Sequence, residues 1–199
     1  MPMLELDHLV VAAPTLADGV AWCEAVLGVT PAAGGRHALM STHNRLLRLD
    51  GETWPRAYLE IIAIDPEAPP PGRARWFDLD DECLQSRLRE YGPQLVHWVA
   101  RTPDLEAALA ERARAGHDGG RILAASRETP NGLLRWRIAV RHDGARDLPL
   151  PTLIEWGAVH PWDALPAAGV ALVGFEAGAE GLVASLQCPA GLVTLRCLS

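Results

Sequence analysis

The stretch LDHLVVAAP, residues 6–14, returns later in the chain as LVHWVARTP, residues 95–103. The two stretches align at a constant offset, which pairs His8 with His97. Each has the length and apolar content of a buried strand, and each is followed by a helical pattern that ends at a glycine. Only two copies are present, so the pattern predicts a duplicated module and not a solenoid.

Three β-rich runs follow the helix in each half of the chain. The last run of the first half, YLEI at residues 58–61, aligns with LIEW at residues 153–156. This alignment pairs Glu60 with Glu155 and requires a small insertion in the second half. Each half is therefore predicted to fold as βαβββ.

The predicted fold class is α+β, with two paired βαβββ modules whose strands form a cupped sheet. The modules are predicted over residues 1–66 and 95–158. The proline-rich stretch DPEAPPPGRAR leads into a linker with a helix, residues 67–94. Residues 159–199 are predicted to form a short β-rich C-terminal extension.

Composition excludes several classes of function. The net charge is −7 and all 18 basic residues are arginine, which argues against nucleic acid as a partner and excludes Schiff-base chemistry on lysine. No window has the roughly 20 apolar residues of a membrane span. The four cysteines are scattered and read as reduced thiols of a cytoplasmic protein. The expected partner is a small molecule, and a homodimer is compatible with the sequence.

Four residues are candidate metal ligands, because the duplicated pattern places one His on the first strand and one Glu on the last strand of each module: His8, Glu60, His97 and Glu155. Two nitrogen and two oxygen ligands suit a divalent metal ion such as Zn, Ni, Co, Fe or Mn. Such an ion would stabilise negative charge on a substrate oxygen. The alternative is that these positions persist as hydrogen-bonded polar groups in a cup without metal.

Five stretches together resemble glyoxalase-like proteins of the vicinal-oxygen-chelate superfamily, in order and spacing, over roughly residues 4–160: LDHLVVAAP, STHNRLLRL, YLEIIAIDP, LVHWVARTPDL and LIEWG. The resemblance implies the cupped fold and a metal site at His8, Glu60, His97 and Glu155. It also implies that one glutamate, Glu155 or Glu60, moves a proton on the bound substrate. The long linker and the C-terminal extension argue against glutathione-dependent methylglyoxal chemistry.

Further residues are candidate substrate contacts. His43 and Asn44 are polar neighbours in an apolar strand, only one of them can face the cup, and Asn44 is preferred. Arg127 is a candidate for a bidentate contact with a substrate carboxylate, and Trp136 for a wall of the cup. The remaining histidines have turn-like neighbours and are predicted to lie on the surface: His37, His117, His142 and His160.

Three hypotheses of function follow. The first is a metal-dependent enzyme of isomerase or lyase type that transfers a proton on a small oxygen-rich organic molecule. The second is a non-catalytic protein that sequesters an apolar aromatic ligand with Trp98, Trp136 and Trp156. The third is an extradiol-type dioxygenase, which needs iron on two histidines and one carboxylate.

Overall fold

The computed structural model describes residues 3–129 and 132–198. The first half of the chain forms a strand, a helix and three further strands: β1 (Glu5–Ala12), α1 (Leu16–Leu27), β2 (Ala32–His37), β3 (Thr42–Arg48) and β4 (Tyr58–Ile64). The second half repeats this order: β5 (Gln94–Arg101), α3 (Leu105–Arg114), β6 (Arg121–Thr129), β7 (Gly132–Val140) and β8 (Thr152–Trp156). The predicted pair of βαβββ modules is confirmed.

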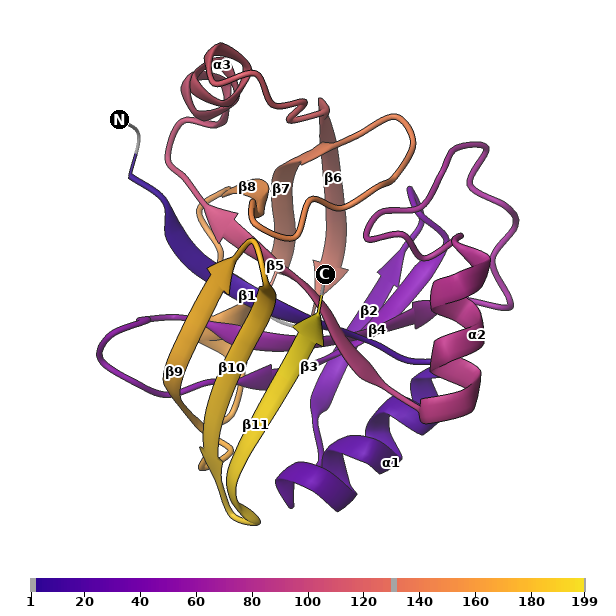
Figure 1. Ribbon diagram of the computed structural model, residues 1–199, viewed down its shortest axis with the longest axis vertical. Coiled ribbons are helices and arrows are strands. Elements are labelled where there is room, and N and C mark those ends of the chain that lie inside the picture. Colours follow the sequence, from indigo (N-terminus) through magenta and orange to yellow (C-terminus); the bar gives the residue numbers. More distant parts are fainter. Residues whose placement is uncertain (1–2, 130–131, 199) are drawn as a thin grey trace.

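The two modules share one eight-stranded curved sheet, in the order β2-β3-β4-β1-β5-β8-β7-β6. They join where β1 and β5 pair in antiparallel fashion, while β4 and β8 run parallel to β1 and β5 respectively. The edge strands β2 and β6 stand at opposite ends of this order, yet they contact each other. The sheet therefore curls into a cup whose concave face is built by both modules (Figure 1).

The first helix has the ends that its sequence indicates. The Thr15 side chain caps it by accepting a hydrogen bond from the backbone N–H of Asp18, which would otherwise have no intrahelical partner. Gly28 ends it with a left-handed φ of 75°, a conformation that glycine adopts without steric cost. Cys23 and Leu27 face inward from this helix and pack on the convex side of the sheet.

A second, three-stranded sheet covers part of the convex side. Its strands are β9 (Ala171–Gly178), β10 (Gly181–Cys188) and β11 (Gly191–Leu198), which confirms the predicted β-rich extension. Buried side chains such as Leu182 and Leu186 pack in one cluster with those of α1 and with the convex-side residues of β1 and β4. Helix α3 covers the second module on the same side of the sheet. The concave side is left for a site.

The linker is part of the core and not only a connection. Trp76, Phe77 and Leu79 are buried against the concave face, together with residues of α2 (Glu82–Tyr91). Phe77 and Asp78 hold left-handed φ angles of 61° and 58°, which non-glycine residues adopt at a cost on the order of 1 kcal/mol each. The burial of the Trp76 and Phe77 rings offsets this cost. The same backbone conformation places both rings in the middle of the cup.

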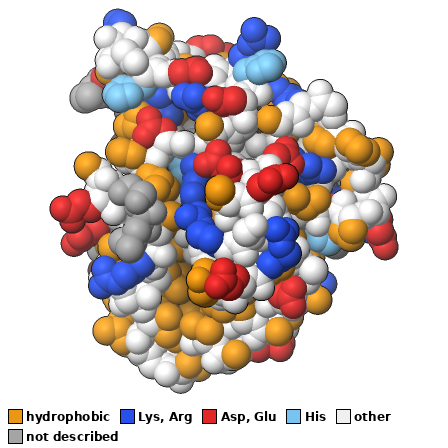
Figure 2. Space-filling model, turned by 45° about the vertical axis from the view of Figure 1, so that its right-hand side comes forward, with side chains coloured by type: hydrophobic (Ala, Val, Ile, Leu, Met, Phe, Trp, Pro, Cys, Tyr) orange, Lys and Arg blue, Asp and Glu red, His pale blue; other side chains and the backbone are white. Residues whose placement is uncertain are grey.

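The surface agrees with the charge balance of the sequence. On the face shown in Figure 2, acidic side chains lie among the arginines, so no continuous basic surface is present on that face. Cys23, Cys83 and Cys188 are free thiols, as expected. Within residues 3–129 and 132–198, no helix is long and apolar enough to cross a membrane.

Candidate functional site

A narrow pocket lies in the concave face of the sheet. Polar side chains from β1 to β4 gather on one part of its wall, and apolar side chains from the second module form most of the rest. The linker closes it on one side with Trp76 and Phe77. It is lined by His8, His37, Asn44, Leu46, Tyr58, Glu60, Trp76, Phe77, Arg127, Leu134, Trp136, Ile138, Ile154, Trp156 and Pro161.

An irregularity in β1 turns two successive polar side chains toward the cup. The pairing with β5 shifts between Leu6 and His8, which leaves Asp7 as an extra residue in the strand. Such a bulge re-aims side chains that strict alternation would send to opposite faces. Asp7 is fully buried and accepts hydrogen bonds from His8 Nδ1 at 2.6 Å and from Trp156 Nε1 at 2.9 Å.

His160, from the C-terminal extension, completes the surroundings of Asp7. Its Nε2 lies 3.0 Å from Asp7 Oδ2, and its Nδ1 accepts a hydrogen bond from the backbone N–H of Trp162. Burial opposes ionisation of Asp7, but the bonds from His160 and His8 outweigh it and lower the pKa of Asp7 well below its usual value. Asp7 is therefore an ionised carboxylate beneath the floor of the pocket.

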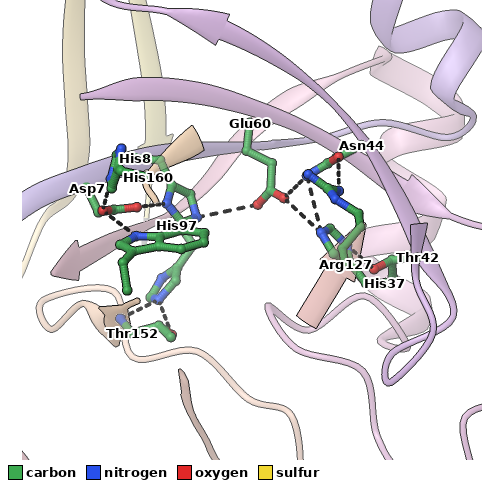
Figure 3. A network of polar contacts seen from close by, with 11 residues as sticks. Asp7, His8, His37, Thr42, Asn44, Glu60, His97, Arg127, Thr152 and His160 are labelled. Carbon is green, nitrogen blue, oxygen red and sulfur yellow. Dashed lines mark hydrogen bonds and ion pairs between the residues drawn. The ribbon is translucent and has the colours of Figure 1, made fainter. Parts of the chain in front are cut away.

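Glu60 is the carboxylate of the pocket itself (Figure 3). Its Oε1 accepts a hydrogen bond from Asn44 Nδ2 at 2.6 Å, and its Oε2 lies 3.5 Å from His8 Nε2. Asn44 is fixed in turn, because its Oδ1 accepts the backbone N–H of Gly35 at 2.8 Å. Burial would raise the pKa of Glu60, but His8 in particular lowers it below its ordinary value. Glu60 is therefore ionised as well.

His8 lies between these two carboxylates. Burial disfavours its charge, yet the hydrogen bond to Asp7 and the nearby Glu60 raise the pKa of His8 to about 9. The ring stacks on Tyr58, with ring centroids 4.6 Å apart. Burial, with Asp7 and Glu60 nearby, raises the pKa of Tyr58 well above its usual value, so its hydroxyl stays protonated. The pocket thus holds a carboxylate–imidazolium–carboxylate chain beside a neutral phenol.

His37 and His160 were predicted to lie on the surface, and this prediction is wrong: the two side chains are 8% and 4% exposed. His37 ends β2, where its Nδ1 lies 3.0 Å from Thr42 Oγ1 and its Nε2 lies 3.3 Å from Asn44 Nδ2. Burial lowers the pKa of His37 to about 4, so the ring is neutral. The surface prediction for His37 rested on its turn-like neighbours in the sequence. Edge strand β2 curls over the pocket and so carries His37 into its wall.

The second module contributes a cation and aromatic walls. Arg127 of β6 reaches the pocket, where its Nη1 donates to Asn44 Oδ1 at 3.4 Å. Trp136 of β7 and Trp156 of β8 lie with their ring centroids 5.7 Å apart. The polar first module and the aromatic second module therefore face each other across one pocket.

The comparisons with known proteins agree with this architecture. A family model described as a glyoxalase-like domain matches residues 6–185. The chain belongs to this glyoxalase-like family. The match includes the linker and most of the C-terminal extension. No curated protein matches the sequence of this glyoxalase-like chain.

Several solved structures are similar to this chain to different degrees. A hypothetical protein from Staphylococcus aureus is 13% identical, with a TM-score of 0.57 over 98% of this glyoxalase-like chain and 85% of its own. A methylmalonyl-CoA epimerase from Mycobacterium tuberculosis is 16% identical over 76% of this chain and 86% of its own, with a TM-score of 0.43. A Streptomyces coelicolor methylmalonyl-CoA epimerase variant, in complex with 2-nitronate-propionyl-CoA, is 20% identical over 78% of this chain and 100% of its own, with a TM-score of 0.48.

The glyoxalase-like chain does not assemble the predicted quartet of metal ligands. Glu155 lies on the convex side of the sheet, where its carboxylate accepts hydrogen bonds from Arg137 Nη2 at 2.6 Å and from the backbone N–H of Leu105 at 3.0 Å. In β8 it is Ile154 and Trp156 that face the pocket. Alternation along a strand then sends the residue between them to the other face. The prediction that Glu155 joins Glu60 in one cavity is wrong.

His97 is also kept apart from the pocket. Phe77 lies against its ring with centroids 5.4 Å apart, and Trp76 and Phe77 separate it from His8 and Glu60. Its Nε2 accepts the backbone N–H of Thr152 at 3.1 Å, so that nitrogen is occupied. Burial and the nearby Arg146 lower the pKa of His97 to about 3.

The resemblance seen in the sequence implies a divalent metal ion held by His8, Glu60, His97 and Glu155 of the glyoxalase-like chain. Within residues 3–129 and 132–198, no group of three or more His, Cys, Asp or Glu side chains is arranged to hold a metal ion. Of the four predicted ligands only His8 and Glu60 line the pocket, and the two ring nitrogens of His8 already face Asp7 and Glu60. The residues present therefore do not fit the predicted Zn, Ni, Co, Fe or Mn site.

The other predicted contacts divide by strand alternation. Asn44 and Trp136 line the pocket, as does Arg127, whereas His43 points away from it. Sequence reasoning missed Asp7 and Tyr58. The signal for Asp7 was a charged residue directly before His8 inside an otherwise apolar strand, since such a residue needs a buried partner.

Proposed function

We propose that this chain is an enzyme that transfers a proton on a small, oxygen-rich organic molecule held in the pocket, with Glu60 as the proton acceptor. One observation carries the proposal: Glu60 is an ionised carboxylate, 5% exposed, in a pocket whose remaining walls are largely apolar and aromatic. A base placed in such surroundings removes a proton without competition from bulk water. Isomerase and lyase chemistry both begin with this step.

The neighbours of Glu60 have distinct roles in this proposal. Asn44 holds Oε1 at 2.6 Å and so orients the carboxylate. Oε2, which is 3.5 Å from His8 Nε2 and only weakly engaged, receives the proton from a carbon next to a substrate carbonyl. Arg127 supplies positive charge for the substrate oxygens, on which negative charge develops. No step is assigned to a metal ion, because the predicted ligand set does not form.

Deuterium exchange tests the proposal without knowledge of the final product. The protein is incubated in D₂O with a panel of small carbonyl compounds that carry an acidic C–H, and loss of the C–H signal is followed by ¹H NMR. We expect the wild type to accelerate exchange for at least one compound, and Glu60→Gln to lower that rate by about 100- to 10,000-fold, the usual contribution of a positioned base. Glu155→Gln makes the same chemical change outside the pocket and should retain exchange.

A second candidate function is binding without catalysis. The observation that favours it is the lowered pKa of Glu60, which makes this carboxylate a weaker base. Under this alternative the aromatic walls, Trp136 and Trp156, hold a ligand that leaves unchanged. Trp98, also expected there, packs against Phe175 on the convex side. If the protein binds compounds of the panel but accelerates deuterium exchange in none of them, the binding function is supported and the enzymatic one is not. An extradiol-type dioxygenase is not proposed, because no two-His, one-carboxylate set among residues 3–129 and 132–198 is arranged to hold a metal ion.

A further inference from the structure

Arg127 differs from most partly buried arginines of this protein in its partners. Arg101, Arg137 and Arg146 each form an ion pair with a carboxylate. Arg127 forms no ion pair in the described part of the chain, although it is half-buried and lines the pocket. Its buried Nε also has no hydrogen-bond partner among those residues. Its cation is thus incompletely compensated by the protein.

The backbone makes room for this cation. Gly35 of β2 lies directly under the guanidinium, since a Cβ atom built there would be 2.5 Å from Arg127 Nη1 and 2.6 Å from its Cδ. Nη1 points to the neutral Asn44 Oδ1 at 3.4 Å, which is a weak interaction for a charged donor. Burial lowers the pKa of Arg127 more than the nearby Glu60 raises it, so the folded protein still bears part of the cost of keeping the charge there. An anion that enters the pocket would offset this cost.

The rest of the wall indicates the shape of that anion. Three indole rings, those of Trp76, Trp136 and Trp156, line the same pocket. The edge of His37 meets Trp76 with ring centroids 5.2 Å apart. Flat aromatic ligands gain from stacked and edge-to-face contacts with such rings, beyond the burial of apolar area. One incompletely compensated arginine matches one negative charge, and its planar guanidinium matches a planar carboxylate.

We propose that the ligand of this pocket is an aromatic monocarboxylate, whose carboxylate pairs with Arg127 while its ring lies among Trp76, Trp136 and Trp156. This inference rests on the proposed function, because it names the substrate class of the same pocket. The carboxylate pairs with the side of Arg127 turned away from Glu60, whose like charge would repel it. Asn44 separates the two charges, because its Nδ2 donates to Glu60 at 2.6 Å and its Oδ1 lies 3.4 Å from Arg127 Nη1. The carbon acid therefore lies between the two side chains, with its proton toward Glu60.

Calorimetric titration with matched ligands tests the charge and the ring separately. Phenylacetate and phenylacetamide share a shape and differ in charge, while cyclohexylacetate keeps the charge and loses the aromatic ring. For the wild type we expect phenylacetate to bind about 10- to 100-fold more tightly than the amide, as for hydrogen bonds to a charged group. Cyclohexylacetate should bind about 2- to 10-fold more weakly than phenylacetate, because it lacks the aromatic contacts.

Variants locate the effect. In Arg127→Met, the affinities for phenylacetate and phenylacetamide should differ by no more than about 2-fold. A difference of that size is within the usual deviation from additivity. Arg121→Met, an exposed position on the same strand, should leave the preference unchanged. Arg127→Lys keeps the positive charge but lacks the planar guanidinium, so its preference for the acid over the amide should lie between those of the wild type and Arg127→Met. This variant maintains the test if Arg127→Met does not fold.

Three results would overturn the inference: equal affinity of acid and amide for the wild type, an acid preference that survives Arg127→Met in a folded protein, or no binding of any acid. Glu60→Gln should lose deuterium exchange and still bind phenylacetate more tightly than phenylacetamide, because Arg127 is unchanged. If the wild type prefers the acid but shows no deuterium exchange, the ligand class is supported and the catalytic proposal is removed.

Discussion

Thr152 occupies in the second module the place that Glu60 occupies in the first. On β4, Glu60 lies opposite Val10 of β1, and on β8, Thr152 lies opposite Val99 of β5. Each contacts the histidine of its own module: Glu60 Oε2 is 3.5 Å from His8 Nε2, and Thr152 Oγ1 is 3.0 Å from His97 Nε2. One module therefore has an ion pair where the other has a neutral contact, and this difference places the candidate chemistry in one half of the cup.

A carboxylate at position 152 should change the protonation of His97. In Thr152→Glu, the new carboxylate comes within reach of Nε2, and the pKa of His97 should rise well above its value of about 3, as Glu60 and Asp7 raise that of His8. NMR of the imidazole resonances as a function of pH measures this shift. Thr152→Gln has the same shape without the charge, so a similar shift in both variants would contradict the explanation.

The buried imidazolium predicts how stability depends on pH. The pKa of His8 rises from 6.5 to about 9 on folding, so the folded state binds more protons than the unfolded state between these values. The stabilisation is complete below about pH 6.5 and is lost as pH rises through 9, with a magnitude on the order of 3 kcal/mol. Denaturant unfolding of wild type and His8→Gln at several pH values measures it. Equal alkaline slopes in the two proteins would show that His8 is not charged.

A methyl group at position 35 should displace Arg127 and leave the fold intact. Because the added Cβ would meet the flexible Arg127 side chain, Gly35→Ala should move the guanidinium out of the pocket. The affinity for phenylacetate should then fall about as far as in Arg127→Met. Gly178→Ala is a matched control, since a Cβ there meets nothing within 4 Å. Unchanged binding by Gly35→Ala at an unchanged melting temperature would place Arg127 outside the binding site.

Removal of the indole that divides the cup should be costly. Trp76 is 5% exposed and lies between the pocket and the cavity beside His97. Trp76→Ala should lower the free energy of unfolding by about 3–5 kcal/mol, the usual effect of truncating a buried aromatic residue. Tyr91→Ala, at a side chain that is 68% exposed, should change it by less than about 0.5 kcal/mol. Urea unfolding of both variants gives the comparison, and equal losses would show that the linker does not pack in the cup.

The sequence by itself determined the duplicated βαβββ order, because strand-length apolar runs, Thr15 at a helix start and Gly28 at a helix end are local features. Strand alternation also predicted that only one of His43 and Asn44 faces the cup, and the structure decided which, since Asn44 lines the pocket. The candidate base Glu60 was predicted from the duplicated His and Glu positions, and the cation Arg127 from its place directly after the run ILAAS.

Only the tertiary structure decided which predicted site residues meet. Aligning YLEI with LIEW matched Glu60 to Glu155, but the pairing of β8 with β5 makes Thr152 the equivalent residue, three positions earlier. An odd shift in a strand reverses the face of every side chain, so Glu155 lies outside the cup. Register depends on hydrogen bonds between strands that are distant in sequence, and the similarity of two short sequence stretches does not determine it. The burial of Trp76 and Phe77 in the cup likewise arises from contacts across the whole sheet.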